Sequence, residues 1–256
     1  MARKRGAPDW SELLRGWDAQ QEAFNPDRER RFTVMLDVLA ATLPKRFTAL
    51  DLGCGPGSLS ARILRRFPSS RVIAVDYDPV SLRVGREALG DFRGRLTWVD
   101  AKLGALGWTD RLPRRTVDVA LSTTALHWLR ERDLRLLYRD LGHLLPRGGV
   151  FLDGDHIPWG PRAQGLNRLA EGVRRVRFGK IPLDREWEAW RRWWKKAEGI
   201  PELRLEFEER ARRAAEHPKW PEVPLELHEY ALLRAGFREV GVVWQDFTNR
   251  VLYACR

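Results

Sequence analysis

The stretch T-A-L-D-L-G-C-G-P-G at residues 48–57 constrains this chain most strongly, because an apolar run leads directly into three closely spaced glycines. The apolar run predicts a short buried strand, and apolar residues at helical spacing from Ser58 onward predict a helix. A strand, a glycine turn and a helix in this order present backbone N–H groups and a positive helix terminus to a ligand. Glycine is needed where a side chain would hold the ligand away from the backbone, or where φ is positive.

A second strand follows the turn at the spacing of a nucleoside-binding site. The segment R-V-I-A-V-D ends in Asp76, about twenty residues after the glycines, where a carboxylate can accept hydrogen bonds from both hydroxyls of a ribose. The turn reads G-x-G-x-G, with Ser58 at the sixth position of the dinucleotide fingerprint, and it has no Gly-Lys-Ser/Thr ending. These departures disfavour a dinucleotide and a nucleoside triphosphate as the ligand.

Five motifs in order resemble those of the class I S-adenosylmethionine-dependent methyltransferases. They are D-L-G-C-G-P-G (51–57), V-D-Y-D-P (75–79), W-V-D-A (98–101), V-D-V-A-L-S-T-T-A-L-H-W-L (117–129) and L-L-P-R-G-G-V-F-L (144–152). The resemblance covers residues 25–156 well. It implies an α/β fold with the Rossmann-like, seven-stranded sheet of that family, in the order 3-2-1-4-5-7-6. The A-L-H-W segment is similar to that of the trans-aconitate, malonyl-thioester and quinone-biosynthesis methyltransferases.

The resemblance implies S-adenosylmethionine as the cofactor and gives roles to the residues of the turn. Asp51 resembles the acid that orders the turn and faces the cofactor's amino group. Gly53, Gly55 and Gly57 are expected to let the carboxylate and the ribose of the cofactor lie against the backbone.

The later motifs imply the remaining cofactor contacts. Asp76 is expected to take the ribose hydroxyls, and Tyr77 to lie on the adenine ring. Asp100 resembles the acid that accepts a hydrogen bond from the adenine amino group, although acids after strands are also common helix caps. The Ala101 N–H is expected to meet a ring nitrogen, and Thr123 completes the cofactor-binding set.

The catalytic candidates follow the fourth and fifth strands. Methyl transfer from a sulfonium needs alignment of the nucleophile and exclusion of water, and it needs a general base only if the acceptor must lose a proton. His127 is the first candidate for a base or for a hydrogen bond to the acceptor, and packing beside Trp128 is the alternative role. His156 is the second candidate. Asp153, Asp155 and His156 lie close together without helical i, i+4 geometry, so no metal is expected.

Charge leaves two substrate classes open. The net charge is +11, which invites a nucleic-acid partner. However, 39 of the 46 basic residues are arginines, and residues 162–196 alone carry +7 against +4 for residues 48–156. The sequence lacks the Asn/Asp-Pro-Pro-Tyr/Phe signature and the Pro-Cys pair of two nucleic-acid methylation chemistries. Arginines of the basic segment could clamp an anionic acceptor, and a solvated helix face is the favoured alternative for each one.

Hydrophobic periodicity divides the chain into three parts. Residues 1–156 are expected to hold two N-terminal helices, the second capped by Asn25, and a cofactor-binding core with strands at 48–52, 71–76, 95–99, 117–122 and 149–154. Residues 157–235 exceed the single helix that the fold needs and predict an inserted helical cap, with a stripe of tryptophans from Trp187 to Trp194. Residues 236–256 predict the β-hairpin that completes the sheet.

These observations predict an S-adenosylmethionine-dependent methyltransferase that acts on a small molecule. An RNA methyltransferase is the first alternative, a nicotinamide-dependent oxidoreductase the second, and a non-enzymatic cofactor-binding module the third. No segment approaches the roughly eighteen apolar residues needed to span a bilayer. With two cysteines, Cys54 and Cys255, and no apolar leader, a cytoplasmic protein is expected.

Overall fold

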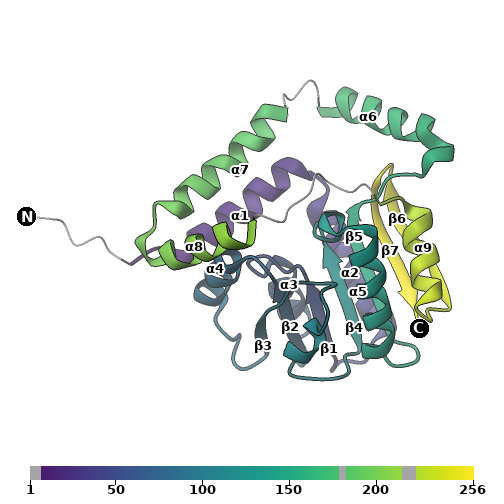
Figure 1. Cartoon of the computed structure of the whole chain (residues 1–256), viewed down its shortest axis with the longest axis horizontal. Helices are drawn as coiled ribbons and strands as arrows, with labels where there is room; N and C mark the ends of the chain where they lie inside the picture. Colours follow the sequence, from purple (N-terminus) through teal and green to yellow (C-terminus); the bar gives the residue numbers. More distant parts are fainter. Residues whose placement is uncertain (1–6, 179–182, 215–222) are drawn as a thin grey trace, which may run out of the picture.

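A seven-stranded sheet in the order β3-β2-β1-β4-β5-β7-β6 forms the centre of the computed structural model, which describes residues 7–178, 183–214 and 223–256 (Figure 1). The strands are β1 Thr48–Leu52, β2 Arg71–Asp76, β3 Leu96–Asp100, β4 Val119–Thr123, β5 Val150–His156, β6 Glu239–Asp246 and β7 Asn249–Cys255. The first five strands are parallel, and β7 is antiparallel to both β5 and β6. The predicted strand order and terminal hairpin are confirmed.

Helices cover both faces of the sheet, as a parallel sheet requires. They are α1 Trp10–Phe24, α2 Arg28–Thr42, α3 Ser58–Arg66, α4 Pro79–Leu89, α5 Glu131–Leu144, α6 Gln164–Phe178, α7 Leu183–Glu198, α8 Arg204–Ala214 and α9 Leu225–Arg234, with the short 3-10 turns η1 Trp108–Arg111, η2 Leu126–Trp128, η3 Pro161–Ala163 and η4 Pro201–Leu203. Among these described helices, none is both long and apolar enough to cross a membrane.

Two apolar clusters enclose the sheet. On one face, Leu137 of α5 and Leu232 of α9 share a buried cluster with Leu50 of β1. On the other face, Phe32 of α2 and Ile63 of α3 belong to a second buried cluster. All five residues of β1, the strand that leads into the glycine turn, are buried.

The N-terminal helices differ from the prediction at one cap. The Asp9 side chain accepts a hydrogen bond from the Glu12 N–H at 2.8 Å and caps the start of α1. Asn25 does not begin the second helix, because its own N–H closes the end of α1, and Asp27 is the residue that precedes α2. Asn25 is buried, and its side chain lies beside the guanidinium of Arg31. A tertiary contact therefore replaces the expected cap.

The segment between β5 and β6 contains helices with two different positions. Helix α7 runs along α1, where the Trp193 and Trp17 rings meet edge to face with their centres 5.0 Å apart (Figure 1). The tryptophans of the predicted stripe stack edge to face or tilted on one another, and Trp187 meets Phe24 of α1. Helix α9, in contrast, packs on the sheet beside α5 and β6. The aromatic stripe thus packs α7 onto the N-terminal helix.

Candidate functional site

The glycine turn lies between the end of β1 and the start of α3 at Ser58. Gly53, Gly55 and Gly57 have φ of 68°, 53° and 87°, a conformation that residues with side chains rarely adopt. The Gly53 N–H donates to the Val75 carbonyl at 2.8 Å, and the Gly55 N–H donates to Asp76 Oδ2 at 2.6 Å. The turn is therefore held against the carboxyl end of β2.

Asp76 is fixed by backbone donors on both oxygens. Oδ1 accepts from the N–H groups of Tyr77 and Asp78 at 2.7 and 2.8 Å, while Oδ2 accepts from Gly55. Loss of hydration raises the pKa of Asp76 to about 6, against the lowering effect of these hydrogen bonds. Since each carboxylate oxygen has two lone pairs, Oδ2 retains capacity for a further donor such as a ribose hydroxyl.

Asp51 supplies a buried acceptor directly behind the turn. Its Oδ2 accepts from the Ser60 hydroxyl at 2.6 Å, whereas Oδ1 has no donor among the described residues. Burial raises the pKa of Asp51 to about 7, with Ser60 opposing this effect. A buried carboxylate oxygen without a donor is costly unless something pairs with it, and the ammonium group of an amino-acid moiety is chemically suited to do so. The donor and acceptor groups around the turn therefore fit S-adenosylmethionine.

Helix α1 covers this turn. A side-chain carbon at Gly55 would approach the Trp17 ring to 3.3 Å. The neighbouring Asp18 accepts from the Ser58 hydroxyl at 2.6 Å and pairs with Arg28 at 2.8 Å. The first helix is therefore tied to the first turn of α3 by a hydrogen bond as well as by ring contact.

The adenine side of the predicted site lies where β3 ends. Arg213 of α8 pairs with both oxygens of Asp100, at 2.8 and 2.9 Å, and its guanidinium lies 4.5 Å from the centre of the Tyr77 ring. The Ala101 N–H, which we expected to meet a ring nitrogen, instead donates to the Asp76 carbonyl at 2.9 Å. That donor is used because the β2–β3 ladder continues one residue farther than predicted.

The acceptor side of the site begins at the end of β4. Thr123 is the last residue of the strand, and its hydroxyl lies 3.4 Å from that of Thr124. Thr124 has a φ of 53°, which is strained for a β-branched residue. Its N–H donates to the Gly154 carbonyl at 3.0 Å, so the strained turn is tied to β5.

A histidine and a carboxylate meet just beyond this turn. His127 Nδ1 lies 2.8 and 2.9 Å from the two oxygens of Asp155, and the His127 N–H also donates to Asp155. Burial alone would raise the pKa of Asp155, but His127 and Arg31 hold it well below its usual range. An ionised Asp155 assigns the proton of the neutral ring to Nδ1 and the lone pair to Nε2. This is the geometry of an oriented base or hydrogen-bonding group.

Sequence reasoning missed Arg31, a fully buried residue that organises the acceptor side. Its Nη1 donates to the Thr124 hydroxyl at 2.9 Å and to the Gly154 carbonyl at 2.7 Å, and its Nε donates to Asn249 Oδ1 at 3.0 Å. Burial lowers the pKa of Arg31 to about 10, which leaves it charged at neutral pH. Arg31 stands four residues before Met35 on the apolar face of α2, and a charge on that face was the available signal.

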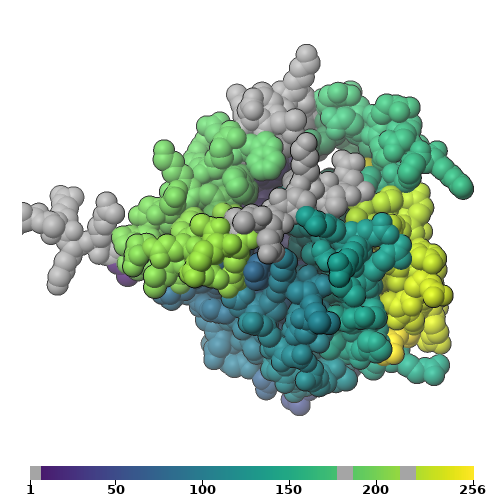
Figure 2. Space-filling model, viewed as in Figure 1, coloured from purple at the N-terminus to yellow at the C-terminus, as the bar shows by residue number. Residues whose placement is uncertain are grey.

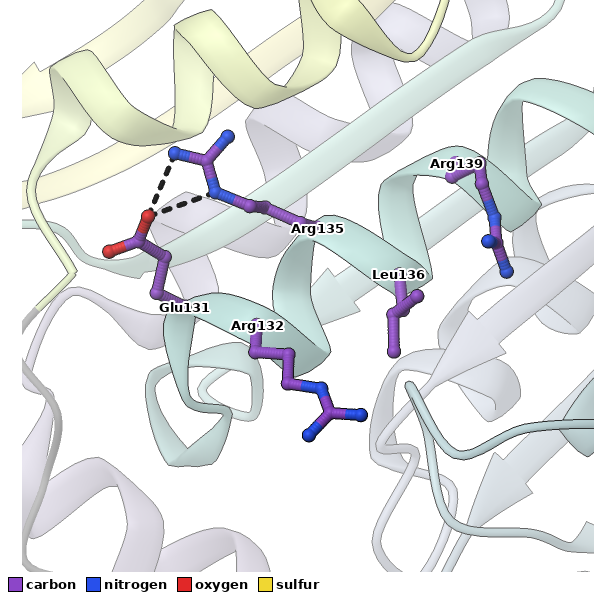
Figure 3. A pocket seen from close by; sticks show the side chains of 5 residues that line it. All are labelled: Glu131, Arg132, Arg135, Leu136 and Arg139. Carbon is purple, nitrogen blue, oxygen red and sulfur yellow. Dashed lines mark hydrogen bonds and ion pairs between the residues drawn. The ribbon is translucent and has the colours of Figure 1, made fainter.

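His156, the second catalytic candidate, lies beside the His127–Asp155 pair. His156 is exposed at the end of β5, and its N–H donates to Asp155 Oδ1 at 2.7 Å. Across the parts of the chain that the structure describes, no group of three or more His, Cys, Asp and Glu side chains is arranged to hold a metal. A separate surface pocket is lined by one helix alone, α5, through Glu131, Arg132, Arg135, Leu136 and Arg139 (Figure 3).

Comparison with known proteins agrees with this geometry. Residues 49–149 match the family model described as a methyltransferase domain. Trans-aconitate 2-methyltransferase from Azoarcus sp. (strain BH72) is 36% identical over 135 residues, which are 52% of this chain and 48% of that protein. The corresponding protein of Methylobacterium radiotolerans is 35% identical over 142 residues, 56% of this chain and 47% of that protein. The chain thus spans about half the length of the curated relatives it matches.

Solved structures share the fold at low sequence identity. An O-methyltransferase family protein from Burkholderia thailandensis has a TM-score of 0.56 and 19% identity, covering 96% of this chain and 62% of that chain. Human N-acetylserotonin methyltransferase, solved in complex with S-adenosylmethionine, has a TM-score of 0.53 and 14% identity, covering 95% of this chain and 55% of that chain. These likenesses concern the fold alone.

Proposed function

We propose that this chain is a class I S-adenosylmethionine-dependent methyltransferase and that it methylates a small-molecule acceptor. The observation that supports the proposal best is the hydrogen bond from the Gly55 N–H to Asp76. This hydrogen bond joins the glycine turn to Asp76 at the carboxyl end of β2. The His127–Asp155 pair lies at the carboxyl ends of the parallel strands β4 and β5 of the same sheet. Ligands of α/β sheets bind at this carboxyl edge.

The proposed cofactor site uses backbone and carboxylate groups. S-adenosylmethionine, when bound, supplies a methyl group on a positively charged sulfur. The proposed contacts are those predicted from the motifs, with Ala101 removed: Asp51, Gly53, Gly55, Gly57, Asp76, Tyr77, Asp100 and Thr123. Asp51 and Asp76 supply acceptors for the ammonium and ribose groups, and Trp17 closes the turn against water.

We propose that His127 acts on the acceptor and that Asp155 is its positioning residue. Asp155 fixes the ring through Nδ1, so Nε2 accepts a proton in the neutral form and donates one in the charged form. His127 and Arg31 together keep Asp155 ionised, and Arg31 also holds Thr124 in place. His156, adjacent to Asp155, is the second candidate for contact with the acceptor.

An anionic acceptor is the finer part of the proposal. It is supported by the +7 charge of residues 162–196 and by the relatives named for trans-aconitate, a carboxylate. The inserted residues 157–235 are proposed to cap the acceptor site, and α9 is the exception because it covers the sheet. RNA remains the alternative acceptor, on the strength of the net charge of +11. A cytoplasmic location is part of the same proposal, supported by the free cysteines Cys54 and Cys255.

Calorimetry tests the cofactor assignment. S-adenosylhomocysteine should bind in the micromolar range, about −7 to −8 kcal/mol, and NAD and NADP far more weakly. Asp76→Ala should cost about 1–3 kcal/mol of binding free energy by removing the charged acceptor. Nicotinamide binding of equal strength would contradict the assignment. Retention of one structured RNA in preference to a random RNA at physiological salt would favour the alternative acceptor.

A transfer assay with trans-aconitate as the first probe tests the role of His127. His127→Gln should lower kcat by about 10²–10⁴-fold, with the affinity for S-adenosylhomocysteine unchanged. His143→Gln, which alters an exposed histidine at the end of α5, is the matched control. A rate that falls at low pH identifies a base, and one that falls at high pH identifies a donor to an anionic acceptor. A kcat unaffected by His127→Gln would remove the residue from the mechanism.

A further inference from the structure

The arginine at the end of α8 occupies the part of the site that is proposed for adenine. Arg213 Nη1 and Nη2 lie 2.8 and 2.9 Å from the two oxygens of Asp100. The same Nη1 donates to the Tyr77 carbonyl at 2.6 Å, and the guanidinium covers the Tyr77 ring at 4.5 Å. The sheet does not require this contact, because Asp100 is the last residue of β3 and Tyr77 follows the end of β2.

These contacts use the groups that a purine would use. An adenine amino group needs a carboxylate acceptor, and the purine ring needs a flat aromatic face. A guanidinium is also planar, donates through a rigid fork and stacks on aromatic rings. Because Arg213 takes both Asp100 oxygens and lies over Tyr77, it stands where the purine would stack.

We propose that α8 is a gate on the adenine subsite, in which Arg213 fills the subsite before S-adenosylmethionine binds and leaves when it does. This inference rests on the proposed function, since it uses the cofactor site defined there. The gate makes cofactor binding compete with an internal ion pair. Binding is therefore coupled to the position of the inserted segment that carries α8.

The way α8 is attached suits such a movement. None of residues 204–213 is buried, and the helix lies on the surface next to α4 (Figures 1 and 2). Its polar links to the core are ion pairs, Glu206 with Arg83 at 3.0 Å and Arg210 with Asp78 at 2.6 Å. Its apolar anchors are Leu203, which is buried in η4 just before the helix begins, and the half-buried Phe207, whose ring centre lies 6.1 Å from that of Trp194.

Ion pairs near the surface contribute little to holding α8 in place, so opening the gate requires little free energy. The Arg213 and Asp100 side chains are 18% and 34% exposed, so solvent and salt weaken their attraction. Arg210 also lies over the Trp194 ring, with its guanidinium 3.9 Å from the ring centre. Withdrawal of α8 would change the surroundings of this tryptophan, which provides an optical signal.

Binding of S-adenosylhomocysteine to the purified full chain tests the gate. Arg213→Gln removes the competing cation and should tighten binding about three- to tenfold. Arg212→Gln is the matched control, because Arg212 is exposed and pairs with Glu209 at 2.8 Å on the same helix. Its affinity should stay within about twofold of the wild type. Salt should strengthen binding to the wild type by screening the ion pair, and should have little effect on Arg213→Gln.

Hydrogen exchange supplies a readout that does not depend on affinity. Adding S-adenosylhomocysteine to the wild type should accelerate exchange of the amides of residues 204–213 and change tryptophan fluorescence. Weaker binding by Arg213→Gln, or slower exchange in α8, would show that Arg213 is a ligand of the cofactor and would overturn the gate alone. Unchanged affinity would also overturn it. Absence of binding by both proteins would overturn the proposed function and the gate together.

Discussion

The two halves of the site are built from different kinds of interaction. Around β1 and β2, the contacts are backbone N–H groups directed at one acid, Asp76, which accepts from Gly55 of the turn, 21 residues away, and from its neighbours Tyr77 and Asp78. Around β4 and β5, they are side chains brought together from distant segments, such as Arg31 and Asn249, which are 218 residues apart. The first half depends on φ and on local spacing. The second depends on the fold being complete.

This difference predicts unequal responses to mutation. Mutations in the glycine turn should weaken ligand binding with only a modest loss of protein stability, because the geometry of the turn is local. Mutations in the side-chain half should mainly lower the stability of the protein, because its charged groups are buried and their contacts come from distant segments. The three experiments below test this contrast in order of decreasing effect.

The largest effect is expected from Arg31→Met. The substitution removes the hydrogen bonds of Arg31 to Thr124, Gly154 and Asn249, together with the positive charge that acts on the buried Asp155, and should lower the free energy of unfolding by about 3–5 kcal/mol. Arg30→Met, at the exposed neighbouring position, should change it by less than about 0.5 kcal/mol. Urea denaturation followed by circular dichroism provides the measurement. Equal stability of the two variants would mean that the buried network is not a stabilising unit.

The contrast also explains what the sequence could predict. The sheet order was implied by the resemblance to the methyltransferase family, whereas the exact bounds of β1 and β2 followed from apolar runs, because each strand is coded locally. The glycine turn was predictable for the same reason. The role of Arg31 was not, since its place on the apolar face of α2 indicates only that it is buried, and its partners Asn249 and Thr124 lie far away in the sequence. Asn25 was predicted to be a helix cap because the residues around it in the sequence do not indicate its contact with Arg31.

A second experiment uses pH to examine how far the buried network extends. His228 of α9 is buried and its Nδ1 lies 2.7 Å from the Tyr138 hydroxyl. Burial lowers the pKa of His228 from 6.5 to about 4. Between these values the unfolded chain binds more protons than the folded protein, so stability is lost as the pH falls through this window.

The loss attributable to His228 should be on the order of 3 kcal/mol below pH 4. His228→Gln should remove that part of the pH dependence while the free energy of unfolding is followed by urea denaturation from pH 7 to pH 4. His143→Gln, at an exposed position, should retain it. If the wild type and His228→Gln lose stability in parallel, the histidine is hydrated in the folded protein and does not belong to the buried network.

The smallest effect on stability, and the sharpest test of the contrast, is expected from a pair of glycines. Gly55 and Gly94 both have positive φ, 53° and 73°, so alanine at either position should cost about 1–2 kcal/mol of stability through backbone strain. A side-chain carbon at Gly94 meets open space, whereas one at Gly55 lies 3.3 Å from Trp17 on the face where the ligand is proposed to bind. Gly55→Ala should therefore weaken binding of S-adenosylhomocysteine by about tenfold or more, some 1.4 kcal/mol, and Gly94→Ala should leave it unchanged. Calorimetry and thermal unfolding of the same samples separate the two effects. Equal affinities would show that the turn is closed by α1 rather than open to a ligand, and the first half of the site would then be structural like the second.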